Sequence, residues 1–211
     1  MPSVLSRRPG GADEQRRRTR ERIELATIEL LAEGHAFAGL SIGDISARAS
    51  VSRPTFYTYF ADKRALVLAL GARLEVDVRE AAKEWLQDRT DDLPTTLRAV
   101  LDAFAAHRET VRAVVEAATY DEDVAAFWRE FHAWFIDNAV GRARSADPDL
   151  PDEDAEALAH ALVWMTERAF TEHLEAPRAG DEAILRAVER LWRSVVPATD
   201  EGTAATPTPG R

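Results

Sequence analysis

Apolar residues recur along this chain with the 3.6-residue period of helices, and the alternation typical of strands is nowhere sustained. Ile23, Ala26 and Leu30 form one apolar stripe of a helix expected over residues 13–33. Gly34 follows directly, at the position where a left-handed residue commonly ends a helix. The pattern predicts an all-α protein of about nine helices.

The expected helices are short after the first one and longer further along the chain. Two short helices are expected at residues 41–50 and from Ser52 onward, followed by a long one over 62–89. Others are expected near 94–107, 108–119, 121–143, 152–175 and 181–195, joined by loops rich in Pro, Gly and Asp. Residues 1–12 and 197–211 have the composition of disordered tails.

The two short helices carry their own start signals. Ser41 is placed to cap the first, and Leu40 and Ile45 have the spacing of a hydrophobic staple. Ser52 is placed to cap the second, and Pro54 lies in its first turn, where no helical hydrogen bond is lost. Because only a few residues separate the two helices, they must cross steeply, which is the geometry of a helix-turn-helix.

The second short helix divides its side chains by face when projected at 100° per residue. Phe56 and Phe60 point toward the preceding helices as core. The other residues point outward or lie on the flanks: Pro54, Thr55 and Thr58 outward, Tyr57 and Tyr59 on the flanks. Small outward residues allow close approach to base edges in a major groove, and the phenols can reach phosphates. The alternative is a helical hairpin with two rings in its core and two tyrosines at its surface.

The charge distribution raises nucleic acid as a partner without deciding it. The net charge is −10, but residues 1–64 carry +3 and the rest −13. A charged tail and a solvated helix face would give the same balance. Lys63 is expected to bind a phosphate, and Arg53 a base or a phosphate. The capping residues Ser41 and Ser52 complete the predicted DNA-binding set.

The stretch "SIGDISARASVSRPTFYTYFADKRAL" resembles the DNA-binding signature of the TetR/AcrR family of transcriptional regulators. The matching residues occur in order without gaps: Ile45, Ala49, Val51, Ser52, Thr55, Phe56, Tyr57, Tyr59, Phe60, Lys63 and Leu66. "SRPTFYTYF" is most similar to the subgroup that includes the mycobacterial ethionamide-resistance regulator. Ser50 stands where the family usually has a turn glycine, which predicts backbone strain. Ser46 replaces a small apolar residue, which predicts looser packing.

The resemblance implies an N-terminal three-helix DNA-binding domain, expected over 13–64, and a helical effector-binding and dimerisation domain over 65–196. The last two helices have wide apolar faces that could pair with those of a second copy. The expected dimer residues are Leu158, Leu162, Met165, Ile184, Val188, Leu191 and Val195. The alternative is that both helices complete the core of the monomer.

An aromatic-rich helix suggests where an effector could bind. Five large aromatic residues lie between Phe127 and Phe135, and an aromatic-lined pocket suits a small, mostly apolar ligand. The same residues could instead be ordinary core. The expected ligand-binding residues are Phe104, Trp128, Phe131, Phe135, Asn138, Thr166 and Glu167.

The function that follows is a cytoplasmic homodimeric repressor that binds double-stranded DNA at a palindromic operator. An effector that tilts the helix at 62–89 would relieve repression. The alternative is a helical ligand-binding or interaction protein without sequence-specific DNA binding.

No catalytic or metal-binding pattern is present in the sequence. There is no cysteine, no HExxH, no GxSxG and no phosphate-binding loop. His160 and Glu167 lie two turns apart on one expected helix and are interpreted as a buried polar pair. We therefore expect no enzyme activity, cofactor or metal, and no apolar run is long enough to span a membrane.

Overall fold

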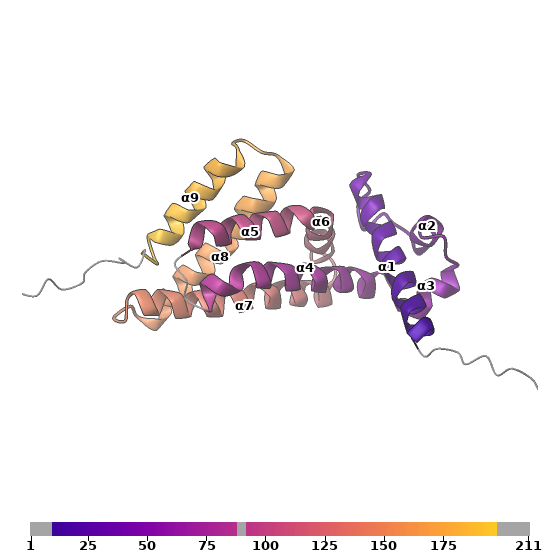
Figure 1. Ribbon diagram of the computed structural model, residues 1–211, viewed down its shortest axis with the longest axis horizontal. Coiled ribbons are helices and arrows are strands. Elements are labelled where there is room, and N and C mark those ends of the chain that lie inside the picture. Colours follow the sequence, from indigo (N-terminus) through magenta and orange to yellow (C-terminus); the bar gives the residue numbers. More distant parts are fainter. Residues whose placement is uncertain (1–9, 88–91, 198–211) are drawn as a thin grey trace, which may run out of the picture. The chain divides into compact units, whose positions relative to one another are not determined.

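The computed structural model describes residues 10–87 and 92–197. These residues form nine helices and no strand (Figure 1). The helices are α1 (Gly10–Ala32), α2 (Ile42–Arg48), α3 (Arg53–Tyr59), α4 (Lys63–Leu86), α5 (Leu93–Ala106), α6 (Arg108–Ala117), α7 (Glu122–Ala146), α8 (Asp152–Glu175) and α9 (Asp181–Arg193). The all-α prediction is confirmed. Most of the predicted tails lie outside the described residues, but residues 10–12 are helical, so α1 begins earlier than predicted.

The chain divides into two compact units. Unit 1 comprises Met1–Asp77 and Ala106–Phe131, and unit 2 comprises Val78–Ala105 and His132–Arg211. Helices α4 and α7 each contribute residues to both units. The domain division at residue 64 stays a prediction.

Unit 1 packs α1, α2 and α3 around the apolar positions that the helical period indicates. Ile23, Ala26 and Leu30 are buried on α1, and Phe56 and Phe60 are buried beneath α3, as predicted. Helix α2 packs against both α1 and α3 (Figure 1). Gly34 has a φ of 92°, which confirms the left-handed residue after α1.

Elsewhere in unit 1, side chains of α6 and α7 approach α4 closely at Gly71. A β-carbon there would lie 2.7 Å from Cε1 of Phe127 on α7 and 3.4 Å from Cγ2 of Val114 on α6. The absence of a side chain at Gly71 therefore lets the Phe127 ring lie directly against α4.

Unit 2 is built around two tryptophans. The rings of Trp85 and Trp192 meet edge to face with their centroids 5.3 Å apart. The guanidinium of Arg142 lies 4.4 Å from the Trp85 ring centroid, and Trp192 Nε1 donates a hydrogen bond of 2.9 Å to the Thr166 hydroxyl. Helices α4, α7, α8 and α9 are thus joined at one aromatic cluster, in which the indoles are buried and α8 packs against α9.

Candidate nucleic-acid interface

Helix α2 begins with a complete capping box. The Ser41 hydroxyl accepts a hydrogen bond from Asp44 N (3.1 Å), and the Asp44 carboxylate accepts from Ser41 N (2.9 Å). The Ser41 hydroxyl and backbone amide hold the pKa of Asp44 below its ordinary value, because both stabilise its charged form. The predicted cap at Ser41 is confirmed. The Ser41 cap therefore sets where α2 begins, and the buried Ile45 fixes which side of α2 faces the core.

Helix α3 is also capped by a serine, without a capping box, and Phe56 and Phe60 form its buried side as predicted. The Ser52 hydroxyl accepts from Thr55 N (3.1 Å) and lies 2.8 Å from the Thr55 hydroxyl. Pro54 is in the first turn, and its carbonyl accepts from the Thr58 hydroxyl (3.2 Å). Of the two flanking tyrosines, Tyr57 is 55% exposed. Helix α3 thus presents small polar groups and a phenol to solvent.

The turn between α2 and α3 contains the strained residue that the sequence indicated. Ser50 has a φ of 52°, in the left-handed region that glycine adopts without cost. Arg22 on α1 supports this turn by donating through Nη2 to Ala49 O (2.9 Å) and Ser50 O (3.1 Å). Sequence reasoning did not identify Arg22, which lies 27 positions before Ala49.

Lys63 is engaged inside unit 1, which corrects the expectation of a phosphate contact. Its ammonium donates to the backbone carbonyls of Phe37 (2.8 Å), Ala38 (3.1 Å) and Leu40 (2.6 Å). It also lies 4.9 Å from the Phe37 ring centroid. Burial lowers its pKa. Because an ammonium has three hydrogens, none is left for DNA in this arrangement.

Glu116 on α6 binds backbone amides of the same segment, the loop between α1 and α2. The Glu116 carboxylate accepts from Phe37 N (2.9 Å) and Ala38 N (2.8 Å). A cation on α4 and an anion on α6 therefore hold the loop between α1 and α2. Nothing in the local sequence marks Glu116, because its partners are 78 and 79 positions away.

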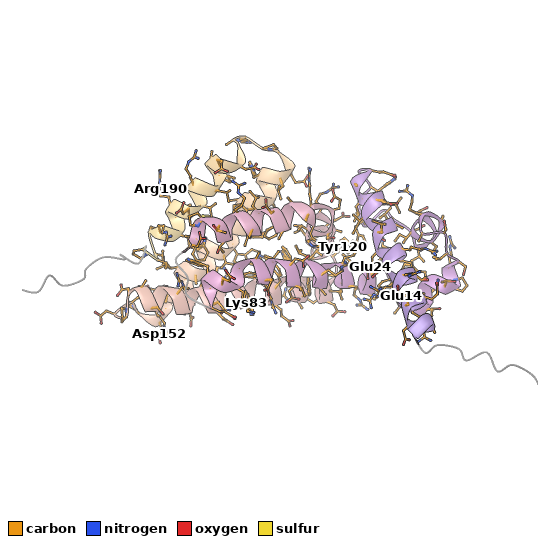
Figure 2. All side chains as sticks on the ribbon, in the orientation of Figure 1. Glu14, Glu24, Lys83, Tyr120, Asp152 and Arg190 are labelled. Atoms are coloured by element: carbon orange, nitrogen blue, oxygen red, sulfur yellow. The ribbon has the colours of Figure 1, made fainter. Side chains whose placement is uncertain are left out.

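A buried carboxylate, that of Glu24, joins α1 to α4 through two arginines. Glu24, labelled in Figure 2, is 5% exposed. Its carboxylate binds Arg20 Nε (3.0 Å) and Arg73 Nη1 (3.0 Å). The Arg20 guanidinium also lies 5.3 Å from the Phe60 ring centroid. Both carboxylate oxygens of Glu24 are thus satisfied, which a buried charge requires.

Two of the predicted dimer residues are core residues of unit 2. Leu162 and Val188 are buried, which corrects the expectation that they face a second copy. Leu158 and Leu191 are 36% and 46% exposed, and three further positions are half-buried: Met165, Ile184 and Val195. The outer side of α8 and α9 therefore keeps only part of the predicted apolar face.

Comparison with known proteins shows which family the chain belongs to. A family model described as "Bacterial regulatory proteins, tetR family" matches residues 25–70, and one described as "Transcriptional regulator EthR, C-terminal domain" matches residues 93–197. The HTH-type transcriptional regulator EthR of Mycolicibacterium smegmatis is 31% identical over 212 residues, with 94% of each chain covered. EthR of Mycobacterium tuberculosis is 32% identical over 199 residues, with 88% of each covered. The chain belongs to the TetR family of transcriptional regulators.

Within the TetR family, these matches identify a regulator of the EthR-like type. It is a DNA-binding transcriptional regulator and not an enzyme. Among solved structures, a TetR-like transcriptional regulator from Rhodococcus sp. RHA1 gives a TM-score of 0.66 at 21% identity, covering 83% of this chain and 94% of that one. GusR of Salmonella enterica gives 0.65 at 21% identity, covering 84% and 95%. These two likenesses bear on the fold alone.

The residues predicted to bind an effector are distributed over both units of this TetR-family chain. Trp128 and Phe131 belong to unit 1, where their rings stack with centroids 4.8 Å apart. Phe104, Phe135, Asn138, Thr166 and Glu167 belong to unit 2. All are buried except Asn138, which is half-buried.

Two of the polar residues predicted to bind an effector, Asn138 and Thr166, have internal partners. Asn138 donates to Trp134 O (2.7 Å) and accepts from Gln87 Nε2 (3.3 Å). The Thr166 hydroxyl donates to Leu162 O (2.7 Å) in addition to accepting from the Trp192 indole. Thr166 therefore holds α8 and α9 together in this state.

Glu167 is the third polar residue predicted to bind an effector, and its neighbour is not the one that the sequence suggested. His160 is exposed, so the interpretation of a buried His160–Glu167 pair is wrong. His132 on α7 is 1% exposed; its Nε2 lies 4.0 Å from the Glu167 carboxylate, and its ring stacks on Trp164. Burial raises the pKa of Glu167, while a hydrogen bond from Thr171 opposes the rise. Glu167 is thus a buried carboxyl group near the His132 ring, which stacks on Trp164.

None of the described helices combines the length and apolar character needed to cross a membrane.

Proposed function

We propose that this TetR-family regulator is a homodimeric repressor that binds a palindromic operator in double-stranded DNA and is released by a small, mostly apolar effector. The observation that carries the proposal is the arrangement of α3. Phe56 and Phe60 anchor the helix, while the exposed Tyr57 and Thr58 face solvent. A helix held in this way can enter a major groove without losing its packing.

The proposed contacts use exposed and half-buried side chains of α3 and the capping residues of α2 and α3. Thr55 and Thr58 read base edges, and Tyr57 and Tyr59 bind phosphates on the two sides of the groove. Arg53 binds a base or a phosphate. Ser41 and Ser52 place the N-termini of the two helices toward the DNA backbone.

Dimerisation is proposed through the part of α8 and α9 that unit 2 leaves accessible. Leu158 and Leu191 supply its exposed apolar side chains. Met165, Ile184 and Val195 extend the surface. Pairing two copies through the same surface gives a two-fold axis, and a two-fold dimer matches a palindromic operator.

Effector binding is proposed in unit 2, among aromatic residues that include Phe104 and Phe135, with Glu167 as the polar group that binds the effector. Helix α4 contributes to both units, so a ligand that displaces it changes the spacing of the two DNA-binding helices. A coupling of about 1–3 kcal/mol would weaken operator binding roughly 5- to 150-fold. As a regulator of promoters, the protein is proposed to act in the cytoplasm.

Selection of bound duplexes from a random DNA pool tests the proposal. We expect a palindromic consensus, and binding to it that weakens steeply with salt. Tyr57→Phe should weaken binding about 3- to 10-fold, since a single hydrogen bond is lost. Tyr120→Phe is the matched control, because Tyr120 is 57% exposed and lies outside α3. The absence of any salt-sensitive duplex binding would refute the DNA-binding proposal.

The effector proposal is tested separately with the selected operator. Compounds are first screened for direct binding to the protein by isothermal titration, and the operator affinity is then measured with each bound ligand at saturation. Unchanged operator affinity in the presence of a bound ligand in unit 2 would contradict the coupling, while leaving the DNA-binding proposal in place.

A further inference from the structure

Gly43, in the first turn of α2, lies directly beneath the Arg53 side chain of α3. A β-carbon at Gly43 would overlap Arg53 Nη2 and lie 3.1 Å from both its Cζ and its Nε. Real β-carbons essentially never approach other heavy atoms so closely. Nη2 therefore occupies space that a side chain at position 43 would need, and Cζ and Nε crowd the same space.

The surroundings of this guanidinium favour its position without neutralising it. Asp44 neighbours Gly43 on α2, and its carboxylate is fixed by the capping box with Ser41. Among the described residues, no carboxylate oxygen forms an ion pair with Arg53, which is exposed. The missing side chain at Gly43 thus leaves room for Arg53 to lie against α2 near the negative charge of Asp44, with donors still open to solvent.

We propose that Gly43 is a positioning residue for DNA binding, because its missing side chain lets Arg53 lie across α2 in the orientation that contacts DNA. This inference rests on the proposed function, in which Arg53 contacts a base or a phosphate. A long side chain that is held before binding loses less rotamer freedom when the complex forms. Gly43 contributes to affinity through this pre-organisation and does not itself read the DNA.

The substitution Gly43→Ala isolates this effect. The overlapping atoms belong to the far end of a flexible side chain, so Arg53 can swing away while the backbone stays in place. Alanine also has a higher helix propensity than glycine, so folding should be retained. Immobilising one free arginine on binding should then weaken operator affinity about 2- to 12-fold.

A double-mutant cycle on the full chain tests the proposal. Affinity for the selected operator is measured by fluorescence anisotropy for the wild type, Gly43→Ala, Arg53→Ala and the double variant. We expect Gly43→Ala to weaken binding in the wild-type background and to have no effect once Arg53 is alanine. Gly141→Ala on α7 is the matched control, since its new β-carbon meets nothing within 4 Å.

The outcomes separate this inference from the function on which it rests. If Gly43→Ala weakens binding equally with and without the guanidinium, or leaves the wild-type affinity unchanged, the positioning role is overturned. If Arg53→Ala leaves both affinity and salt dependence unchanged, the DNA contact of Arg53 is overturned instead. Arg53→Lys provides a second test: it keeps the charge but lacks Nη2, the atom nearest the added β-carbon, so Gly43→Ala should weaken its binding less than that of the wild type.

Discussion

Replacing Lys63 with methionine distinguishes a structural lysine from a phosphate-binding one. The substitution keeps a side chain of similar length and removes the three hydrogen bonds to the carbonyls of Phe37, Ala38 and Leu40. Two of these bonds are partly buried. An unsatisfied buried carbonyl costs about 1–3 kcal/mol, so two half-buried ones should cost about 2 kcal/mol together.

The expected result is a loss of stability without a loss of salt dependence. For a chain of this size, 2 kcal/mol corresponds to a fall in Tm of about 4–8 °C. A phosphate contact would instead contribute about 0.9 to the slope of log Kd against log salt concentration. We expect that slope to be unchanged in Lys63→Met, measured by anisotropy at a temperature well below its Tm.

Lys83→Met is the matched control for Lys63→Met. Lys83 lies on the same helix and is exposed, so its replacement should leave both Tm and the salt slope unchanged. The reasoning is refuted if Lys63→Met keeps the wild-type Tm while its salt slope falls by about one.

Four further substitutions test the energetics of individual positions. Ser46 is 2% exposed, and its hydroxyl has no hydrogen-bond partner among the described residues; Ser46→Ala should therefore raise the free energy of unfolding by about 1 kcal/mol in urea titrations, and a loss of stability would contradict this. Ser50→Gly should raise the free energy of unfolding by about 1 kcal/mol, because glycine adopts the left-handed backbone without strain. Gly34→Ala introduces the same strain at a position with space for the side chain, so it should lower the free energy of unfolding by a similar amount. If both substitutions change the free energy of unfolding in the same direction, the argument is refuted. Burial raises the pKa of Glu167, so its contribution to stability is complete below the ordinary glutamate pKa and is lost as pH rises through the raised value. Glu167→Gln escapes this loss and should have a higher Tm than the wild type at pH 7, with a difference that shrinks toward pH 4.5; a pH-independent difference would count against the assignment.

The parts of the structure that sequence reasoning could reach are those governed by neighbouring residues. The caps at Ser41 and Ser52 act within three residues, and the burial of Phe56 and Phe60 follows from helical periodicity. The strain at Ser50 also depends only on local backbone geometry. These rules fix α2 and α3 before any tertiary contact is known.

The errors arose where one periodic pattern fits two environments. Leu162 and Val188 have the spacing of an exposed apolar face, but the same spacing serves a helix that packs inside its own unit. The spacing of His160 and Glu167 on one helix predicts a pair, whereas the histidine near Glu167 is His132 from α7. Periodicity gives the face of a helix and leaves open which neighbour covers that face.

The loop between α1 and α2 shows why charged residues were the hardest to interpret. A lysine next to an aromatic DNA-reading helix has the residue type and position of a phosphate contact, and only the three carbonyls around Lys63 show its structural use. Glu116 reaches the same loop from α6 and satisfies the amides of Phe37 and Ala38. The loop that leads into α2 is thus held by opposite charges from two other helices of unit 1. Because backbone groups on both sides of this loop depend on α4 and α6, a displacement of either helix would act on the start of α2, close to Gly43 and the guanidinium it positions.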